Sequence, residues 1–354
     1  MDVLTAKEYA QINAKVRALK SYLLSVGDYE KLVQSINVDD AVRLLGATPY
    51  AERMAQVELK PPYDLVQVDR VLSEEFIRTF DLLVNSSTGK AKAFLKIYRE
   101  KFYYDNLKII ISAVTSRTPK QTALQYIVSL SPKEAEEYSI LLDSQNINQL
   151  IDQIRNRKAK EALTAALPLF ESLKTPLVLE NALDKEIYGE LWANIKNLSR
   201  SDKKYAKTII GTKIDILNIL TILRSKALKL RTDIIEQLIL PIFYKSERTI
   251  RECVAASDID GVLNTLSVSE FRYLGYRAKE VYEQTKSIFS IEHAFNEYLI
   301  QIIYSQLLGF PFHIGVPIAF LELKSQEIRN IKIIIVGKVE AVEPSKIRDL
   351  LIIF

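Results

Sequence analysis

The sequence has little cysteine and histidine, and this scarcity excludes several common kinds of functional site. Cys253 is the single cysteine among 354 residues, so the chain has neither an internal disulfide framework nor a thiolate metal cluster. The two histidines, His293 and His313, lie 20 positions apart, which is incompatible with a zinc-binding helix of the HExxH type. We therefore expect no metal ion and a reducing compartment.

Glycine and proline are also scarce, and this shortage bears on the fold class and on nucleotide binding. The 10 glycines and 11 prolines make up about 6% of the chain, roughly half the usual share. All-β folds and disordered chains use more of both residues, so the composition favours helices. Gly89-Lys90 and Gly337-Lys338 do not form phosphate loops, because neither is followed by serine or threonine. We expect no nucleotide or other cofactor.

The balance of charge argues against nucleic-acid-binding and secreted proteins. Lysine and arginine number 48 against 44 aspartates and glutamates, so the net charge of +4 is too small to indicate nucleic acid. Asp2, Lys7 and Glu8 occupy positions where a signal peptide needs an uninterrupted apolar run. The basic, aromatic stretch around Tyr98 and Lys101 suits base stacking, but packing of its aromatic rings at the edge of a helical core is the favoured interpretation.

One segment is long enough to raise the question of membrane insertion. Residues 298–321 contain no formally charged side chain, and 24 residues are sufficient to span a bilayer. Gly309, Pro311, Gly315 and Pro317 interrupt the segment in its middle. We therefore expect the end of one helix, a tight apolar loop and the start of the next helix rather than a membrane span.

The chain contains three approximate repeats of about 110 residues. The first pattern is an acid, any residue, Ala or Val, and then Leu or Phe, and it recurs at spacings of 111 and 112. The second pattern is an acid, any two residues, Lys or Asn, and then Ile, and it recurs at spacings of 110 and 112. The acids of the first pattern are Asp69, Glu180 and Glu292, and those of the second are Asp105, Asp215 and Glu327. The spacings predict three homologous helical domains, at residues 1–115, 116–226 and 227–354.

Each repeat is expected to contain a helical hairpin. Apolar residues at helical spacing fill the runs 90–113, 204–230 and 317–339. A turn lies between the two acids of each repeat, at residues 85–89, 199–202 and 309–312. The β-branched residues at 331–336 leave a strand there as an alternative.

The repeated acids have two interpretations, acid–base chemistry or structural support. A chain rarely needs three copies of one catalytic site, whereas every repeat of a fold needs the same support. We therefore interpret the six acids as helix caps or as partners of lysine and arginine on neighbouring helices. Cys253 and His293 are also interpreted as structural residues, so we expect no catalytic residue.

The three turns are candidates for contact with a partner, because they occupy equivalent positions and are expected to lie at one end of the molecule. The third turn is apolar, and an exposed apolar turn commonly marks a contact surface. Lys203, Lys204 and Lys207 form a small basic patch after the second turn, which suits either an acidic partner or a solvated helix start. The candidate contact residues are Ser87, Lys90, Arg200, Lys203, Phe310 and Phe312.

Segments spread over the whole sequence resemble one known family. They are RALKSYLL at residues 17–24, DNLK at 105–108 and, most densely, LELKSQEIRNIK at 321–332. The sequence resembles the C subunit of archaeal A-type ATP synthases, which is related to the d subunit of vacuolar ATPases. The resemblance covers nearly the whole chain, and the Glu-x-x-Asn motif of the last segment is its most specific part.

The resemblance implies an all-α funnel of three similar domains with pseudo-threefold symmetry. It implies a non-catalytic rotor subunit of a proton- or sodium-translocating ATP synthase or ATPase, bound peripherally at the cytoplasmic face of the cell membrane. The implied partners are the membrane ring of proteolipid subunits and the central shaft, between which the protein transmits torque, with no nucleic acid and no small-molecule substrate. The alternative is an all-helical repeat scaffold that binds a different partner.

Overall fold

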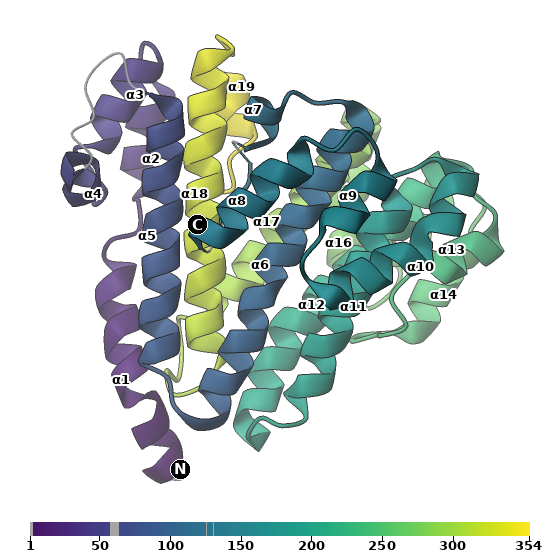
Figure 1. Ribbon diagram of the computed structural model, residues 1–354. Helices are drawn as coiled ribbons and strands as arrows, with labels where there is room; N and C mark the ends of the chain where they lie inside the picture. The colour runs from purple at the N-terminus through teal and green to yellow at the C-terminus, as the bar shows by residue number, and fades with distance from the viewer. Residues whose placement is uncertain (1–2, 57–63, 125, 130) are drawn as a thin grey trace.

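The structure, a computed structural model, describes residues 3–56, 64–124, 126–129 and 131–354, and it is all-α over these ranges. A first helix, α1 (Val3–Lys20), precedes three successive sets of helices (Figure 1). Each set consists of short or medium helices followed by two long helices that form a hairpin. The all-α fold class expected from the sequence is confirmed.

The three sets follow the same order. The first set contains α2 (Val26–Val33), α3 (Val38–Leu45), α4 (Ala51–Gln56), α5 (Leu65–Asn85) and α6 (Gly89–Ser116). The second contains α7 (Lys120–Leu124), α8 (Pro132–Leu142), α9 (Ile147–Gln153), α10 (Arg157–Leu173), α11 (Leu177–Ile195) and α12 (Arg200–Ala227). The third contains α13 (Thr232–Leu238), α14 (Glu247–Ala255), α15 (Ile259–Ser267), α16 (Arg272–Thr285), α17 (Ile288–Ser305) and α18 (Gly315–Val339), and α19 (Pro344–Asp349) follows it.

Side-chain caps fix where the short helices begin, and they recur from set to set. In each cap, a Ser, Asn or Asp side chain accepts a hydrogen bond from the backbone N–H three residues later, which stabilises the helix by about 1 kcal/mol. The caps are Ser25, Ser131 and Ser246 before α2, α8 and α14, and Asn37, Asn146 and Asp258 before α3, α9 and α15.

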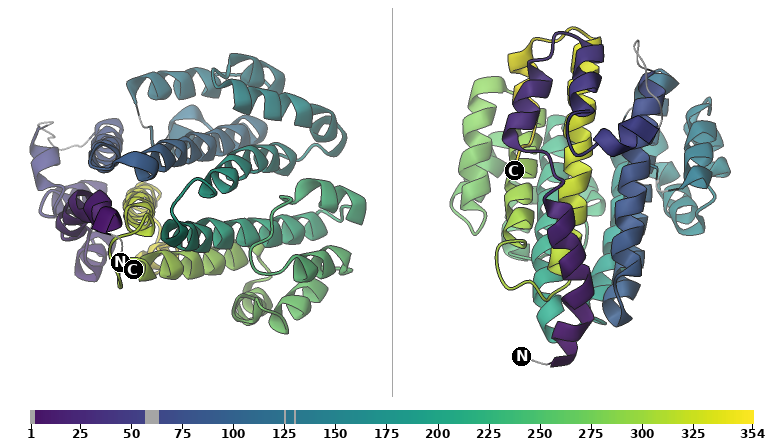
Figure 2. Two further views of the ribbon diagram at one scale, coloured as in Figure 1. Left: turned by 90° about the horizontal axis from the view of Figure 1, so that it is seen from below. Right: turned by 90° about the vertical axis from the view of Figure 1, so that its left-hand side faces the viewer.

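The long helices form a closed ring of packed neighbours. Within the hairpins α5 packs against α6, α11 against α12 and α17 against α18; between the hairpins α6 packs against α11, α12 against α17 and α18 against α5. Figure 2 shows these helices from below and from the side of α1. Because α18 contacts both α5 and α1, the end of the chain lies beside its beginning.

Several short helices cover the long helix of the preceding set, whereas α4, α10 and α16 pack on the hairpin of their own set. α8 packs on α6, α14 packs on α12, and α3 of the first set packs on α18 of the last. Each set therefore depends on its neighbour for part of its core, and the first set depends on the third.

An asparagine in the second long helix of each hairpin fastens the chain that follows. Its side-chain amide donates to and accepts from the backbone of one residue 22 positions later. The pairs are Asn106 with Val128, Asn218 with Leu240 and Asn330 with Ile352. The asparagines are 112 residues apart in both steps, so they mark equivalent positions of the three repeats.

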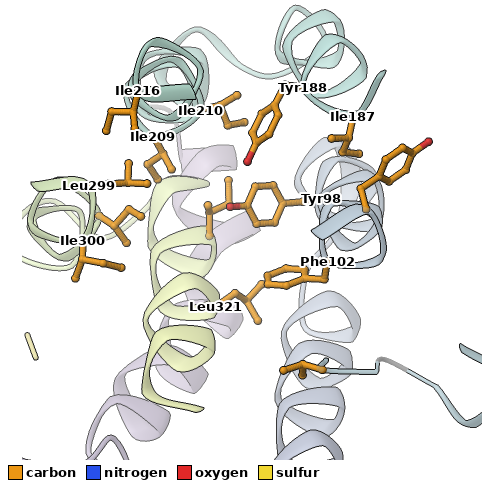
Figure 3. Packing of buried hydrophobic residues seen from close by; sticks show 14 of the residues in the cluster. Tyr98, Phe102, Ile187, Tyr188, Ile209, Ile210, Ile216, Leu299, Ile300 and Leu321 are labelled. Carbon is orange, nitrogen blue, oxygen red and sulfur yellow. The ribbon is translucent and has the colours of Figure 1, made fainter. Parts of the chain in front are cut away.

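Aromatic side chains fill much of the core between the hairpins. Phe76, Phe80 and Phe102 lie edge to face, with ring centroids 5.1 to 6.2 Å apart. Figure 3 shows Tyr98 and Phe102 pointing from α6 toward Leu321 of α18. Burial of one such side chain contributes about 2 to 3 kcal/mol. Because these rings are buried, the packing interpretation of this aromatic stretch is confirmed and the base-stacking interpretation is wrong.

Two further expectations are settled by the helix boundaries. Within residues 298–321, α17 ends at Ser305 and α18 begins at Gly315, so the expected helix, loop and helix are confirmed. In the part of the chain that the structure describes, no helix combines the length and apolarity needed to cross a bilayer. Residues 331–336 lie inside α18, so the alternative of a strand is wrong.

Candidate functional site: the ionic centre and the hairpin end

Arg224 of α12 joins two hairpins through two of the repeated acids. Its guanidinium lies 2.6 Å from the carboxylate of Glu292 on α17 and 3.7 Å from that of Glu180 on α11. Burial raises the pKa of Glu180, and the nearby guanidinium opposes this rise. One cation therefore serves two carboxylates at the contact between the second and third sets.

An ion pair between Asp69 of α5 and Lys332 of α18 closes the ring between the first and third sets. The Lys332 ammonium also donates a hydrogen bond of 2.9 Å to the carbonyl of Ile127. Burial raises the pKa of Asp69 and lowers that of Lys332, and each group partly offsets the shift of the other. The pair thus connects three segments that are far apart in the sequence.

Asp215 binds backbone rather than a basic side chain. Its two carboxylate oxygens accept hydrogen bonds of 2.9 Å from the backbone N–H groups of Tyr244 and Lys245. These residues lie just before α14, so the carboxylate holds the segment between α13 and α14 against α12. Burial nevertheless raises the pKa of Asp215.

Glu327 is completely buried in α18 and binds the first set of helices. Its carboxylate accepts hydrogen bonds from the Leu24 backbone N–H at 2.5 Å and from the Tyr50 hydroxyl at 2.7 Å. Lys324, one turn earlier in α18, lies 2.7 Å from the same carboxylate and supplies the compensating charge. Glu327 therefore makes the same kind of connection as Asp215, from the last long helix to the beginning of the chain.

Asp105 lies in an ionic cluster at the centre of the ring. Lys101 and Lys108 of the same helix approach its carboxylate to 3.0 and 2.9 Å. Lys108 also reaches Asp184 of α11 at 2.7 Å, and Lys101 reaches Glu322 of α18 at 2.9 Å. The cluster joins one long helix from each of the three hairpins.

The carboxylates of this cluster are not poised for proton transfer. Burial raises the pKa of Asp105 and Glu322, but the neighbouring lysines outweigh it and hold both values below the usual range. A general acid or base works best with a pKa near the working pH. Across the described ranges, no three His, Cys, Asp or Glu side chains are grouped as a metal ion requires.

A small cavity adjoins the cluster, with Lys213 of α12 on its wall. The cavity has a volume of about 10 Å³, which suits about one water molecule. Figure 3 shows Tyr188 and Tyr98 directed toward this region. The Tyr188 hydroxyl is buried and has no hydrogen-bond partner among the described residues. Burial lowers the pKa of Lys213 to about 8, and the nearby Lys108 adds to this effect.

The asparagine register corrects the alignment of two acids in the repeats. With a period of 112 residues, Asp215 and Glu327 correspond to Tyr103, so Asp105 is two positions out of register. Likewise, Asp69 corresponds to Asn181 rather than Glu180. The predicted acids are therefore not two sets of three equivalent residues, although a contact with a basic side chain or a backbone N–H is found for each of them.

The turns of the three hairpins lie at the lower end of the molecule in Figure 1, and we call them the hairpin end: residues 86–88, 196–199 and 306–314. The second and third turns touch directly. Asp202, at the start of α12, accepts a hydrogen bond of 2.8 Å from the Ile314 backbone N–H. The ring of His313 stacks on that of Tyr205 with centroids 3.4 Å apart. Helix α1 reaches the third turn through a hydrogen bond from Asn13 to the Pro311 carbonyl.

The six candidate contact residues differ in exposure. Ser87 is buried, and its hydroxyl donates to the Leu83 carbonyl, so its side chain contributes no surface. Phe312 is half-buried against Phe310, with ring centroids 5.5 Å apart. The other four side chains are exposed or partly exposed: Lys90, Arg200, Lys203 and Phe310.

The three asparagines carry the repeat most clearly, and the pattern of acids in the sequence conceals them. Asn218 and Asn330 were within the second pattern, but their equivalence to Asn106 was hidden because the acid was used as the reference point. A search for one residue type at two equal spacings of 112 would have found all three asparagines. The stacking of His313 on Tyr205 has no comparable signal, because the two residues are 108 positions apart.

Comparison with known proteins gives matches along nearly the whole chain. A family model described as ATP synthase (C/AC39) subunit matches residues 12–350. The C subunit of the A-type ATP synthase of Methanocaldococcus jannaschii is 26% identical over 353 residues, covering 99% of this chain and 88% of the relative. The subunits of the same name from Methanobrevibacter smithii and Pyrococcus abyssi are 25% and 24% identical; they cover 99% and 97% of this chain and 89% and 90% of their own lengths.

The fold and the site define a class of all-α repeat proteins in which long hairpins are joined into a ring by buried and partly buried ion pairs. The matched region includes all three hairpins and all six repeated acids. The chain belongs to the ATP synthase (C/AC39) subunit family.

Proposed function

We propose that the protein is a non-catalytic central-stalk subunit of an A/V-type ATP synthase or ATPase that translocates protons or sodium ions. In this role it couples the membrane ring of proteolipid subunits to the central shaft and transmits torque between them. The observation that carries the proposal is the family match over residues 12–350, together with relatives named as the C subunit of A-type ATP synthases along the whole chain.

The closed ring of long helices supports a mechanical role. α6 and α12 have 28 residues each, which corresponds to about 42 Å at 1.5 Å per residue. Ion pairs such as Arg224 with Glu292 resist the sliding of one hairpin past the next. A twist applied at one end of such a ring passes to the other end through all three hairpins.

We assign the hairpin end to the proteolipid ring and the opposite end to the shaft. The apolar third turn, with Phe310 exposed, supports the first assignment. At the opposite end, an open groove of about 450 Å³ lies between α11, α12 and α17 and supports the second. Exposed Leu228 and Phe289 line this groove beside Arg224, so a partner helix finds both an apolar surface and charge there.

The proposal includes the domain division and the location. The domains are residues 1–115, 116–226 and 227–354, arranged with pseudo-threefold symmetry as a funnel. The equal spacing of Asn106, Asn218 and Asn330 supports this division. The protein is peripheral, at the cytoplasmic face of the membrane.

The test is recovery of partners by the tagged full chain from detergent-solubilised membranes, with the bound subunits identified by mass. We expect both the proteolipid and the shaft subunits. Phe310→Asp should reduce recovery of the proteolipid but not of the shaft. Val268→Asp, at a highly exposed apolar position away from the hairpin end, is the matched control. Recovery of neither partner by the unaltered chain would favour a helical scaffold for another protein.

A further inference from the structure

The hairpin end, together with the helix turns that flank it, carries more positive charge than the whole chain. Residues 81–96 contain three lysines and one aspartate, residues 193–208 contain five cations and one aspartate, and residues 304–319 contain no formally charged residue. The three segments together therefore have a charge of +6. Because the complete chain has +4, the remaining residues carry −2.

The cations at this end are little used to hold the fold together, although Lys207 lies 5.7 Å from the ring centre of Trp192. Across the described ranges none of them forms an ion pair, although lysines and arginines elsewhere form many. The eight residues are Lys90, Lys92, Lys96, Lys196, Arg200, Lys203, Lys204 and Lys207. The one aspartate among the second group, Asp202, is buried and accepts hydrogen bonds from Ser199 and the Ile314 backbone, so it does not screen them.

An apolar tip lies beside these cations. In the third turn Leu308 is 58% exposed and Phe310 is 45% exposed. The edge-to-face contact with Phe312 and the hydrogen bond from Asn13 to the Pro311 carbonyl hold this turn in place. Two large apolar side chains are thus exposed to solvent next to several lysines that form no ion pair among the described residues.

We propose that the hairpin end binds the headgroup layer of an anionic phospholipid membrane directly. Leu308 and Phe310 enter the interface, and the cations of the first two hairpins attract the lipid phosphates. Seven of the eight cations are lysines, which act as flexible point charges and lack the fork that arginine offers to a single carboxylate. Charges spread over two hairpins fit a diffuse array of phosphates better than one acidic side chain, and apolar residues beside them are typical of interfacial binding.

The proposed function assigns the same surface to the proteolipid ring, so the lipid contact belongs to the chain that is not seated on that ring, and it needs no other protein. The test is therefore sedimentation of the purified full chain with lipid vesicles alone. We expect binding to phosphatidylcholine vesicles containing about 30% phosphatidylglycerol, no binding to pure phosphatidylcholine, and a steep loss between about 50 and 300 mM salt.

Matched variants identify the surface. The double variant Lys203→Glu and Lys204→Glu should weaken vesicle binding about tenfold or more, and Phe310→Ser should weaken it several-fold. Lys31→Glu with Lys133→Glu makes the same change of charge at two exposed lysines outside the hairpin end and should have little effect. Circular dichroism and the unfolding temperature verify that all variants fold.

Three outcomes would overturn the proposal. The first is absence of binding that depends on phosphatidylglycerol, and the second is equal loss in both double variants. The third is displacement of the protein from the vesicles by a DNA duplex of equal total charge, together with unchanged vesicle binding by Phe310→Ser. That result would indicate a surface that binds any polyanion. Recovery of the proteolipid in detergent distinguishes failure of this proposal from failure of the proposed function, because that experiment contains no bilayer.

Discussion

The side-chain amide of Asn218 forms two hydrogen bonds with the backbone of Leu240, donating at 3.2 Å and accepting at 2.7 Å. The same amide also donates to the Ile242 carbonyl at 3.1 Å. Asn218 is fully buried, so no water replaces these bonds when the amide is removed. One side chain thus satisfies the backbone of the segment between α13 and α14.

Asn218→Leu should therefore destabilise the protein by about 2 to 4 kcal/mol, because it leaves buried backbone groups without partners. The measurement is the free energy of unfolding from urea denaturation. Asn148→Leu, at an exposed position of α9, serves as the control and should change it by less than about 0.5 kcal/mol. Equal effects of the two substitutions would refute the structural role of Asn218.

Arg224→Met should destabilise the protein by about 1 to 3 kcal/mol, because Glu180 and Glu292 lose their shared cation while remaining partly buried. Arg248→Met removes an exposed ion pair with Glu252 and should have an effect below about 0.5 kcal/mol. Thermal and urea unfolding measure both. A loss in Arg224→Met no larger than in Arg248→Met would show that the bridge between hairpins does not contribute.

His313 should make the protein less stable in mild acid. Burial lowers its pKa to about 4, whereas an unfolded histidine has a pKa of about 6.5. The unfolded state therefore binds the proton first, and stability falls as the pH drops from about 6.5 toward 4, by at most about 3 kcal/mol. His313→Phe should remove this part of the pH dependence, so that the variant gains on the unaltered protein at pH 4.5.

Urea denaturation at neutral and acidic pH measures the difference for His313→Phe. Carboxylates also titrate in this pH range and contribute to the pH dependence of both proteins. The control is therefore His293→Phe, which changes a histidine that is partly exposed. An identical pH dependence in both variants would contradict the assignment to His313.

Lys213→Met should raise the stability of the protein by about 1 to 3 kcal/mol near pH 7, because it removes a partly buried cation that has no ion-pair partner among the described residues. Burial lowers the Lys213 pKa to about 8, whereas an unfolded lysine titrates near 10.5. The folded state thus loses its proton first as the pH rises. The advantage of the variant should shrink between about pH 8 and 10.5. Lys133→Met, at an exposed lysine, is the control, and a destabilised Lys213→Met protein would contradict the prediction.

The sequence is sufficient to predict the local structure, but it predicts little of how side chains pair between the hairpins. Gly309 and Pro311 indicated the break between α17 and α18, because their backbone preferences act within a few residues. The alignment of the repeats on their acids is wrong by two positions at Asp105. An acid can pair with any nearby cation, so its position in the helix need not be the same in each repeat. The position of Asn218 is fixed more tightly, because its side-chain amide must reach both the N–H and the carbonyl of Leu240.

The partners of the charged residues depend on how the hairpins close and cannot be read from spacing. Lys332 pairs with Asp69, which is 263 positions earlier, and Lys101 pairs with Glu322, which is 221 positions later. Periodicity places each of these side chains on a helix but not against a particular neighbour. The low pKa of Lys213 has the same origin, because it arises from burial at the place where α6, α11, α17 and α18 meet α12.

The contact of Glu327 with Leu24 and Tyr50 also has a consequence for the order in which the chain folds. During synthesis the first short helices emerge about 300 residues before the carboxylate that completes their core. Until then, the surface that α3 later places on α18 is uncovered, so the nascent first set is a natural target for a chaperone. We therefore expect ring closure to be a late step of folding, because contacts of such large sequence separation cost the most chain entropy to form.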